Sequence, residues 1–389
     1  MISKIAFFLI LMAVVPDVFI DRRFISHKKG VWRRILWWMP SLAMIAYTLV
    51  FVFDRNFAPA DVTVVNVYLF LVGLLVVPKC LFAICSAIGW AIRKVCRSKR
   101  NYGNLVGVLM VVFCWYVLIY GSFVGFRQMK VSHVTYESPC LPEAFDGYSI
   151  VQFSDVHIGS YIGNEELLQM FVDSINAQKA DMVVFTGDLQ NREPQEIYPF
   201  RKMLGSLKAK DGVFSVIGNH DYANYIEASP EVKAANEHET RSLEVQMGWQ
   251  LLINDHRMVR RGGDSIVVAG MDNDGDGRKF PQNGDIAKTL SGVGDSAFVL
   301  MLEHDPTAWR RKILPQGKAQ LTLSGHTHAM QFMLGGWSPV AFVYDEWGGM
   351  YYEGSRAMNV STGVGGFIPF RFGVPGEIVV IELKMKSEE

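Results

Sequence analysis

Long apolar stretches in the first third of the chain constrain its fold more than any other feature. They run from Ile5 to Ile20, Ile35 to Phe53, Val64 to Ile92 and Leu105 to Phe126. A helix needs roughly 20 mainly apolar residues to cross a bilayer, and the last three stretches meet this length. The first is shorter, but no small-residue cleavage pattern follows it, so we expect a retained helix rather than a signal peptide. Residues 1–126 are therefore predicted to form an α-helical transmembrane region of about four helices in the cell membrane.

Basic residues between the stretches predict the orientation in the membrane. The first loop carries Arg22, Arg23, Lys28, Lys29, Arg33 and Arg34, the third carries Arg93, Lys94, Arg97, Lys99 and Arg100, and the second has only Arg55 against Asp54 and Asp61. Loops rich in Lys and Arg stay in the cytoplasm, so we expect everything after Phe126 to be extracytoplasmic. Lys79 interrupts the third stretch, and we interpret it as snorkelling or facing the bundle. We expect no paired charges within the membrane, which argues against a transporter.

The rest of the chain is predicted to be a connector followed by one compact domain. Residues 127–147 are expected to be polar and irregular, and residues 148–389 are long enough for one core. In the second segment, β-branched runs alternate with a stretch of helical period from Asn164 to Gln178. The expected strands are YSIVQFS, MVVFTG, GVFSVIG, SIVVAG, AFVLML, AQLTLSG and EIVVIEL. Near-continuous apolar strands are buried on both faces, so we predict a layered α/β fold with helices outside the sheets.

Polar clusters follow five of these strands directly. They contain Asp155 and His157, then Asp188, then Asn219, His220 and Asp221, then His304, and finally His326 and His328. Ligands of open α/β sheets gather beyond the carboxyl ends of strands. Turn-forming residues also collect at strand ends, but turns do not require five histidines. The clusters therefore predict a single site.

The residue types in these clusters indicate metal binding. Carboxylate, imidazole and amide ligands suit manganese, iron or zinc, and the absence of thiolates argues against a structural zinc site. The number of ligands exceeds what one cation needs. Two divalent cations that share a carboxylate are the arrangement used for displacement at phosphorus. We therefore expect two divalent metal ions as cofactors.

The ordered motifs DxH, GD, GNHD, an isolated His and GHTH resemble the calcineurin-like metallophosphoesterase superfamily. The similarity extends from Tyr148 to Leu383, and DGYSIVQFSDVHIG with IPFRFGVPGEIVVIEL is similar to its membrane-associated bacterial branch. The resemblance implies a β-sandwich of the metallophosphoesterase type flanked by helices. It also implies that one metal is bound by Asp155, His157 and His328 and that the other is bound by Asn219, His304 and His326. The resemblance further implies that Asp188 bridges the two metals and that His220 is catalytic.

Four further positions bear on this resemblance. Asn191 stands where the family often has an acid that polarises the catalytic histidine, and an amide can orient an imidazole without stabilising its charged form. Ala329 and Met330 stand where this branch commonly has glycines, and we expect them to narrow the floor of the pocket. Asp221 is expected to cap a turn or orient the site rather than bind metal.

Two further segments leave alternatives open. DNDGDG, from Asp272 to Gly277, matches the first half of a calcium-binding EF-hand loop, but position twelve is Asn283, so we expect an Asp- and Gly-rich loop near the pocket. The aromatic and Gly-rich segment 332–352 is either a hairpin at the domain edge or a lip that faces the membrane or an acyl chain. Cys140 is the single cysteine after residue 126, so no disulfide is expected within the domain.

The resemblance implies a membrane-anchored two-metal phosphoesterase that hydrolyses a phosphomonoester or phosphodiester, with an envelope lipid or lipid-linked compound as one candidate. The alternatives are a phosphoesterase for soluble nucleotides and a non-catalytic metal-bound sensor or scaffold. The net charge of zero gives no basic surface field, so no nucleic-acid partner is expected. The expected partners are the phosphoester substrate and the lipid bilayer.

Overall fold

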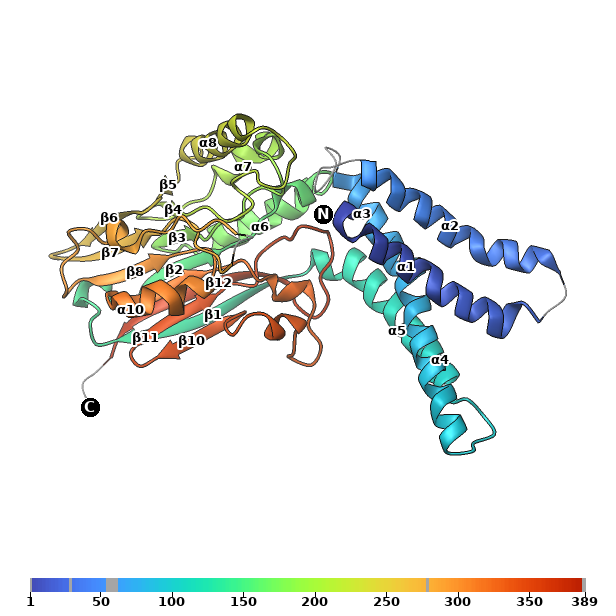
Figure 1. The fold of residues 1–389 in the computed structure, drawn as a ribbon. Coiled ribbons are helices and arrows are strands. Elements are labelled where there is room, and N and C mark those ends of the chain that lie inside the picture. The colour runs from blue at the N-terminus through green and yellow to red at the C-terminus, as the bar shows by residue number, and fades with distance from the viewer. Residues whose placement is uncertain (1, 28–29, 54–61, 278–279, 387–389) are drawn as a thin grey trace. The chain divides into compact units, whose positions relative to one another are not determined.

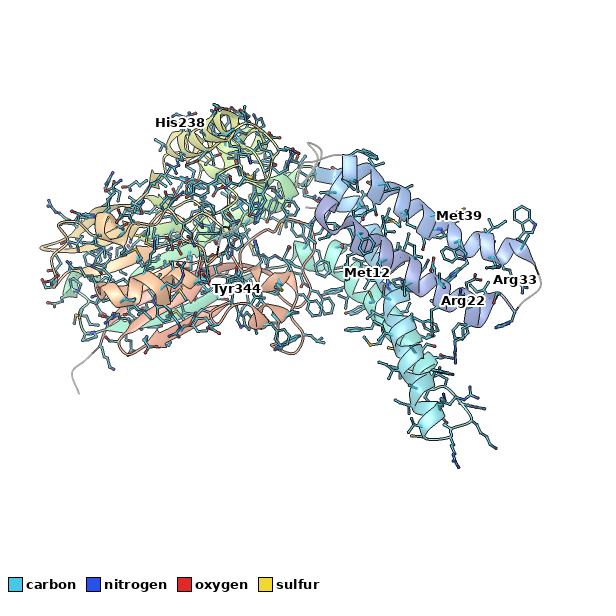
Figure 2. All side chains as sticks on the ribbon, viewed as in Figure 1. Met12, Arg22, Arg33, Met39, His238 and Tyr344 are labelled. Carbon is cyan, nitrogen blue, oxygen red and sulfur yellow. The ribbon has the colours of Figure 1, made fainter. Side chains whose placement is uncertain are left out.

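The computed structural model describes residues 2–27, 30–53, 62–277 and 280–386, which form two compact units, Met1–Val124 and Gly125–Glu389 (Figure 1). The loop charges that we used for orientation at positions 28, 29, 54, 55 and 61 lie outside the described residues. Arg22 and Arg33, labelled in Figure 2, lie at the same end of the first two helices.

The first unit is helical. Its helices are α1 (Ile2–Ile20), which continues into a π-helical turn (Asp21–Ile25), α2 (Val31–Phe53), α3 (Val62–Leu71), a π-helical turn (Val72–Val76) that leads into α4 (Val77–Val95), and α5 (Gly103–Phe123). Within the described residues, three spans are long and apolar enough to cross a membrane: Val31–Phe53, Val62–Val95 and Gly103–Arg127. They coincide with the last three predicted stretches. The first stretch is also helical, and it contains Pro16 and a buried Asp17.

The close approach of α4 and α5 depends on glycine. A Cβ atom on Gly103 would lie 2.1 Å from the carbonyl oxygen of Cys85, and one on Gly89 would lie 2.5 Å from the Cα atom of Gly103. Small residues allow helix backbones to pack closely in membrane proteins. Any side chain at either position would therefore separate the two helices.

The expectation that the helices lack paired charges is wrong. The ammonium nitrogen of Lys79 on α4 lies 2.9 Å from Asp17 Oδ1 on α1. It also donates a 2.8 Å hydrogen bond to Ser41 Oγ on α2 and lies 4.6 Å from the centroid of the Trp37 ring. Lys79 thus faces the bundle, as one of the two interpretations held. Asp17 and Lys79 are 62 positions apart, so only the packing of three helices reveals the pair.

The second unit contains two six-stranded sheets. The first has the order β1-β12-β2-β3-β4-β5, and the second has the order β10-β11-β9-β8-β7-β6. The strands of the first sheet are β1 (Met129–Ser138), β2 (Tyr148–Phe153), β3 (Met182–Phe185), β4 (Val213–Ser215), β5 (Gln250–Leu251) and β12 (Gly376–Met385). The strands of the second sheet are β6 (Asp255–Arg261), β7 (Asp264–Gly270), β8 (Phe298–Leu302), β9 (Ala319–Ser324), β10 (Gly349–Glu353) and β11 (Arg356–Val360).

Alternating side chains divide the core into three layers. Ile150 and Val184 of the first sheet share one buried cluster with Leu300 and Leu321 of the second, so this cluster fills the space between the sheets. The intervening side chains of the first sheet pack on α6 (Glu165–Ala177), and those of the second sheet pack on the helical segment that contains Trp309. A strand sends successive side chains to opposite faces. A continuous apolar run therefore places one set of side chains between the sheets and the other set against the helices. The predicted layered sandwich flanked by helices is confirmed.

The structure differs from the predicted connector. Residues 129–138 form β1, which pairs in parallel with β12 over its whole length, from Met129 opposite Gly376 to Ser138 opposite Met385. The strand was not recognised because its outward side chains are polar and half-exposed, as expected at the edge of a sheet. A long helix that was not predicted, α8 (Pro230–Gln246), begins after Ser229, whose hydroxyl accepts a hydrogen bond from the N–H of Val232.

We predict that Lys79→Met lowers the free energy of unfolding by about 3–5 kcal/mol, because Asp17 is left buried without its partner. The combined variant Asp17→Asn/Lys79→Met should recover most of this loss, since no uncompensated charge remains. Thermal unfolding of the full chain in detergent measures both effects, with Lys99→Met at an exposed position as the control. An equal loss in the single and combined variants would contradict the role of the ion pair.

Candidate metal centre

The loops after five parallel strands bring all the predicted ligand side chains together. They follow β2, β3 and β4 of the first sheet and β8 and β9 of the second. Two groups have one ligand atom per residue within 4.8 Å of one another: Asp155, His157, Asp188 and His328 form the first group, and Asp188, His304 and His326 form the second. Asp188 belongs to both groups, so the geometry allows a shared carboxylate.

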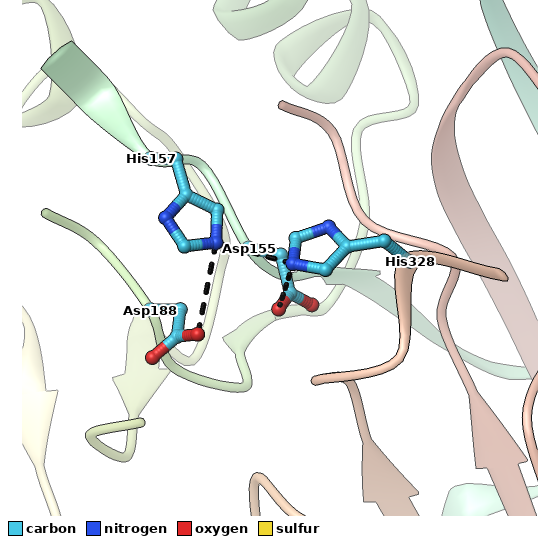
Figure 3. A group of neighbouring side chains, drawn as sticks. All are labelled: Asp155, His157, Asp188 and His328. Atoms are coloured by element: carbon cyan, nitrogen blue, oxygen red, sulfur yellow. Dashed lines mark hydrogen bonds and ion pairs between the residues drawn. The ribbon is translucent and has the colours of Figure 1, made fainter. Parts of the chain in front are cut away.

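The first group surrounds a position suited to a cation (Figure 3). His157 Nε2 lies 3.1 Å from His328 Nε2 and 3.7 Å from Asp188 Oδ2, and His328 Nε2 lies 3.3 Å from Asp155 Oδ1. Burial lowers the pKa of His157 to about 3 and that of His328 well below its usual range. Both rings are therefore neutral near pH 7, and neutral imidazoles offer the lone pairs that metals require. The donors present fit a divalent cation.

The second group contains an amide as well as imidazoles. His304 Nε2 lies 3.2 Å from Asp188 Oδ2, and His326 Nδ1 lies 3.2 Å from His304 Nε2 and 2.8 Å from Asn219 Oδ1. The Nδ1 atom of His304 is paired with the Thr186 carbonyl at 2.7 Å, which leaves Nε2 directed into the group. Burial opposes a charge on His304, but the carboxylates of Asp188 and Asp155 raise its pKa well above the usual value. His304 and Asp188 are therefore strongly coupled by charge.

Tyr225 orients the Asn219 side chain. The amide nitrogen of Asn219 donates a 2.7 Å hydrogen bond to the Tyr225 hydroxyl, so the amide oxygen is turned toward His326. The Tyr225 ring also stacks on the His220 ring with centroids 4.1 Å apart. Tyr225 was not predicted from the sequence. Its position six residues after Asn219 was the only available signal.

Two residues that the sequence analysis missed contact the outer nitrogen of His326. The Tyr344 hydroxyl lies 2.8 Å from His326 Nε2, and Asp305 Oδ2 lies 3.5 Å from it. The other Asp305 oxygen accepts hydrogen bonds from the N–H and hydroxyl of Thr307. Partners of this kind fix the ring of a metal-binding histidine. Asp305 directly follows His304 in the sequence, whereas nothing near Tyr344 marks it.

His220 is oriented by backbone rather than by an acidic side chain. Its Nδ1 atom lies 2.7 Å from the carbonyl oxygen of Asn191, and its N–H donates to Asp188 Oδ1 at 2.8 Å. We expected the Asn191 side-chain amide to make the first contact. That amide donates instead to Ser160 Oγ and to the Phe367 carbonyl. Asn191 therefore supports His220 through its main chain, which a residue of any type could do.

Asp221 joins two loops of the site. Its carboxylate accepts hydrogen bonds of 2.8–3.2 Å from the N–H groups of Gly218, Asp188, Leu189 and Gln190. Four donors occupy the oxygen atoms that a metal would need. The carboxylate instead fixes the loops after β3 and β4 against each other.

The site loops contain an unusual number of strained residues. Asp155, His157, Asp188, His326 and His328 all have positive φ angles, and so do Ala329, Met330 and Gln331. This conformation costs a non-glycine residue about 1–2 kcal/mol. The glycines common in this branch would avoid that cost at positions 329 and 330. Met330 is 47% exposed, whereas Ala329 is buried. What the structure shows at both positions is a strained backbone.

Arg371 holds the last segment of the site. Its guanidinium is fully buried and donates to the carbonyl oxygens of Thr362, Gly363, Gly365, Val374 and Pro375. This places Gly363 so close to Asp155 that a Cβ atom there would lie 2.7 Å from the Asp155 Cβ atom. Gly363 thus lies directly against Asp155 and His328 of the first group.

The loop from Asp272 to Gly277 is not organised as a cation site. The Asp274 carboxylate pairs with Arg311 at 2.9 Å and with Lys312, so its charge is compensated within the protein. Phe280, just beyond this loop, packs on His326 with ring centroids 5.0 Å apart. The loop region therefore lies beside the candidate metal centre, as expected, and takes part in packing.

Models of known protein families match residues in both units. A family model described as "Calcineurin-like phosphoesterase" matches residues 148–330, and one described as "Probable Calcineurin-like phosphoesterase, transmembrane domain" matches residues 3–126. An uncharacterized metallophosphoesterase of Bacillus subtilis, YkuE, is 31% identical over 277 residues, which cover 68% of this chain and 89% of the relative. A Danio rerio transmembrane protein with a metallophosphoesterase domain is 31% identical over 71% of this chain and 62% of its own length. An uncharacterized metallophosphoesterase of Helicobacter pylori is 26% identical over the full length of both chains.

We predict that Tyr225→Phe lowers metal affinity at the second group by about 10–100-fold, because the Asn219 amide loses the acceptor that orients it. Stacking on His220 should remain. Metal content after dialysis against graded free Mn²⁺ measures the change, and Tyr198→Phe, at a half-exposed position, is the control. Equal affinity in the two variants would show that Tyr225 does not orient the ligand.

Proposed function

Because the chain belongs to the calcineurin-like metallophosphoesterase family, we propose that it is a membrane-anchored, two-metal hydrolase of phosphomonoesters or phosphodiesters. Residues 1–126 would be its multi-pass membrane region and residues 148–389 its catalytic domain. The observation that carries the proposal is the pair of ligand groups that share the Asp188 carboxylate.

We assign the two groups to two cations. One would be bound by Asp155, His157 and His328, the other by Asn219, His304 and His326, and both by Asp188. Nitrogen and oxygen donors without thiolates suit manganese, iron or zinc. When bound, such a pair supplies an activated water molecule and stabilises negative charge on the phosphate oxygens.

His220 is the proposed catalytic residue. Pairing of its Nδ1 atom with the Asn191 carbonyl fixes the ring and leaves Nε2 to exchange a proton with the leaving-group oxygen. The ring centroid lies 4.6 Å from that of His157, so a phosphate held at the first group would be within reach of His220. Stacking on Tyr225 limits rotation of the ring, which keeps Nε2 directed toward the substrate.

The alternatives predict different activities. A non-catalytic sensor or scaffold would bind metal without turnover, and an enzyme for soluble nucleotides would not need a membrane. Mn²⁺-dependent hydrolysis of p-nitrophenyl phosphate and of bis(p-nitrophenyl) phosphate separates a catalyst from a scaffold and a monoesterase from a diesterase. If the protein with both metals bound hydrolyses neither ester, the proposed function is rejected.

Two substitutions should separate metal binding from proton transfer. We expect Asp188→Asn to abolish activity and lower metal content, because the shared carboxylate balances charge from both cations. His220→Ala should keep both metals but lose roughly 10²–10⁴-fold in turnover, the scale of acid–base assistance. Metal analysis and steady-state kinetics measure the two effects.

The outcomes that would contradict these assignments differ for the two variants. Normal turnover with two bound metals in Asp188→Asn would exclude the bridging role. Metal loss in His220→Ala would make His220 a ligand. Circular dichroism of each variant checks that the fold is retained.

The proposed orientation places the catalytic domain outside the cytoplasm. The basic first and third loops support it under the positive-inside rule. Alkaline phosphatase fused after Glu389 should then be active, and green fluorescent protein fused there and exported through the general secretory pathway should be dark. A fluorescent fusion together with an inactive phosphatase fusion would reverse the orientation.

A further inference from the structure

The membrane tether enters the second unit at the same edge of the first sheet as the candidate metal centre. The first residue of β1, Met129, lies opposite the first residue of β12, Gly376. β12 runs antiparallel to β2 with Val379 opposite Gln152, so the start of β12 lies beside the end of β2, where Asp155 follows. The helix α5 ends at Phe123 and β1 begins at Met129, so five residues link the last apolar helix to this edge of the sheet.

An apolar lip extends from this edge. We define it as residues 330–343, in which the exposed side chains are Met330, Leu334, Trp337, Phe342 and Val343. Phe342 is 82% exposed and Val343 64% exposed. The sequence from Ala329 to Tyr344 contains no Asp, Glu, Lys, Arg or His. Exposed apolar surface without charge is unfavourable in water and marks an interaction site.

Both ends of the apolar lip connect to the metal centre. It begins two residues after the candidate ligand His328, and Tyr344, which directly follows it and is labelled in Figure 2, contacts His326 Nε2 at 2.8 Å. The N–H of Met333 donates to the Phe372 carbonyl at 2.7 Å, and the Phe332 and Phe372 rings stack. Phe372 lies in the segment that Arg371 holds against Gly363 and Pro375, next to the start of β12. The lip is thus built onto the edge where the tether enters.

We propose that the apolar lip inserts into the bilayer that holds the helical unit, and that the metal centre takes the phosphate ester of a membrane lipid. The substrate part rests on the proposed function, whereas insertion does not. Trp337, whose ring packs edge-on against Phe342 with centroids 5.5 Å apart, suits the interface between head groups and acyl chains. A segment without charges enters that interface without desolvating ions. Because Tyr344 contacts His326, an inserted lip brings the metal ligands to the membrane surface, where lipid phosphates lie.

Photo-crosslinking tests insertion directly. The full chain carries p-benzoylphenylalanine at position 342. It is reconstituted into phosphatidylcholine vesicles in which roughly 10% of the lipid is anionic phosphatidic acid. Irradiation should attach lipid to this variant. The matched control carries the same residue at position 245, where Val245 of α8 is 59% exposed, and should gain no lipid. A crosslink to a second copy of the chain, or equal lipid attachment at both positions, would overturn insertion.

Kinetics test the substrate class with a second pair of variants. Phe342→Ser/Val343→Ser should lower kcat/KM at least about tenfold toward phosphatidic acid or phosphatidylglycerol in vesicles and leave hydrolysis of p-nitrophenyl phosphate unchanged. Val245→Ser should change neither. If p-nitrophenyl phosphate is hydrolysed but neither lipid is, the lipid substrate is rejected. If no ester is hydrolysed, the proposed function fails, while the crosslinking result still decides insertion.

Discussion

A carboxylate buried among histidines is the interaction on which the catalytic domain depends. Asp188 contacts His157 from its own sheet and His304 from the other, and its second oxygen holds the N–H of His220. Burial opposes its charge, but these neighbours keep its pKa well below the usual range. Such a group requires both sheets to end at one place. Several residues that meet at this place have a strained backbone. This strain is tolerated because Asp221 and Arg371 hold the surrounding loops through many hydrogen bonds.

The helical unit also contains a buried charge, which a neighbouring group of opposite charge balances. Lys79 and Asp17 compensate each other inside the bundle, and Ser41 provides a further acceptor for the ammonium group. A buried charge is tolerated when it is paired and hydrogen-bonded. The pair links α1, α2 and α4, so it specifies how helices with otherwise uniform apolar surfaces associate. A first helix of only 19 residues with a proline and an acid is therefore an integral part of the unit.

Prediction from the sequence succeeded where side-chain chemistry is local. Seven strands were recognised from their apolar runs, and the side chains that the structure brings together around Asp188 were named because they follow strands. It failed for β1, whose polar outer face concealed a ten-residue edge strand. It also missed Tyr225, Asp305 and Tyr344, which act on ligands through contacts rather than motifs. At Asn191, the side chain was expected to support His220, but the backbone carbonyl contacts its ring instead.

The amino-acid sequence by itself determined the division into an apolar helical part and an α/β part and the residue types at the centre, because periodicity and spacing are local properties. Its ordered motifs also carried the resemblance to the family that the comparisons show. Only the tertiary structure decided which atoms face each other. The sharing of Asp188 between two groups, the pairing of Lys79 with Asp17 and the junction of the apolar lip with the tether edge all join residues far apart in the chain. Their proximity follows from strand register and helix packing, which depend on the burial of the whole core and cannot be read from any single segment.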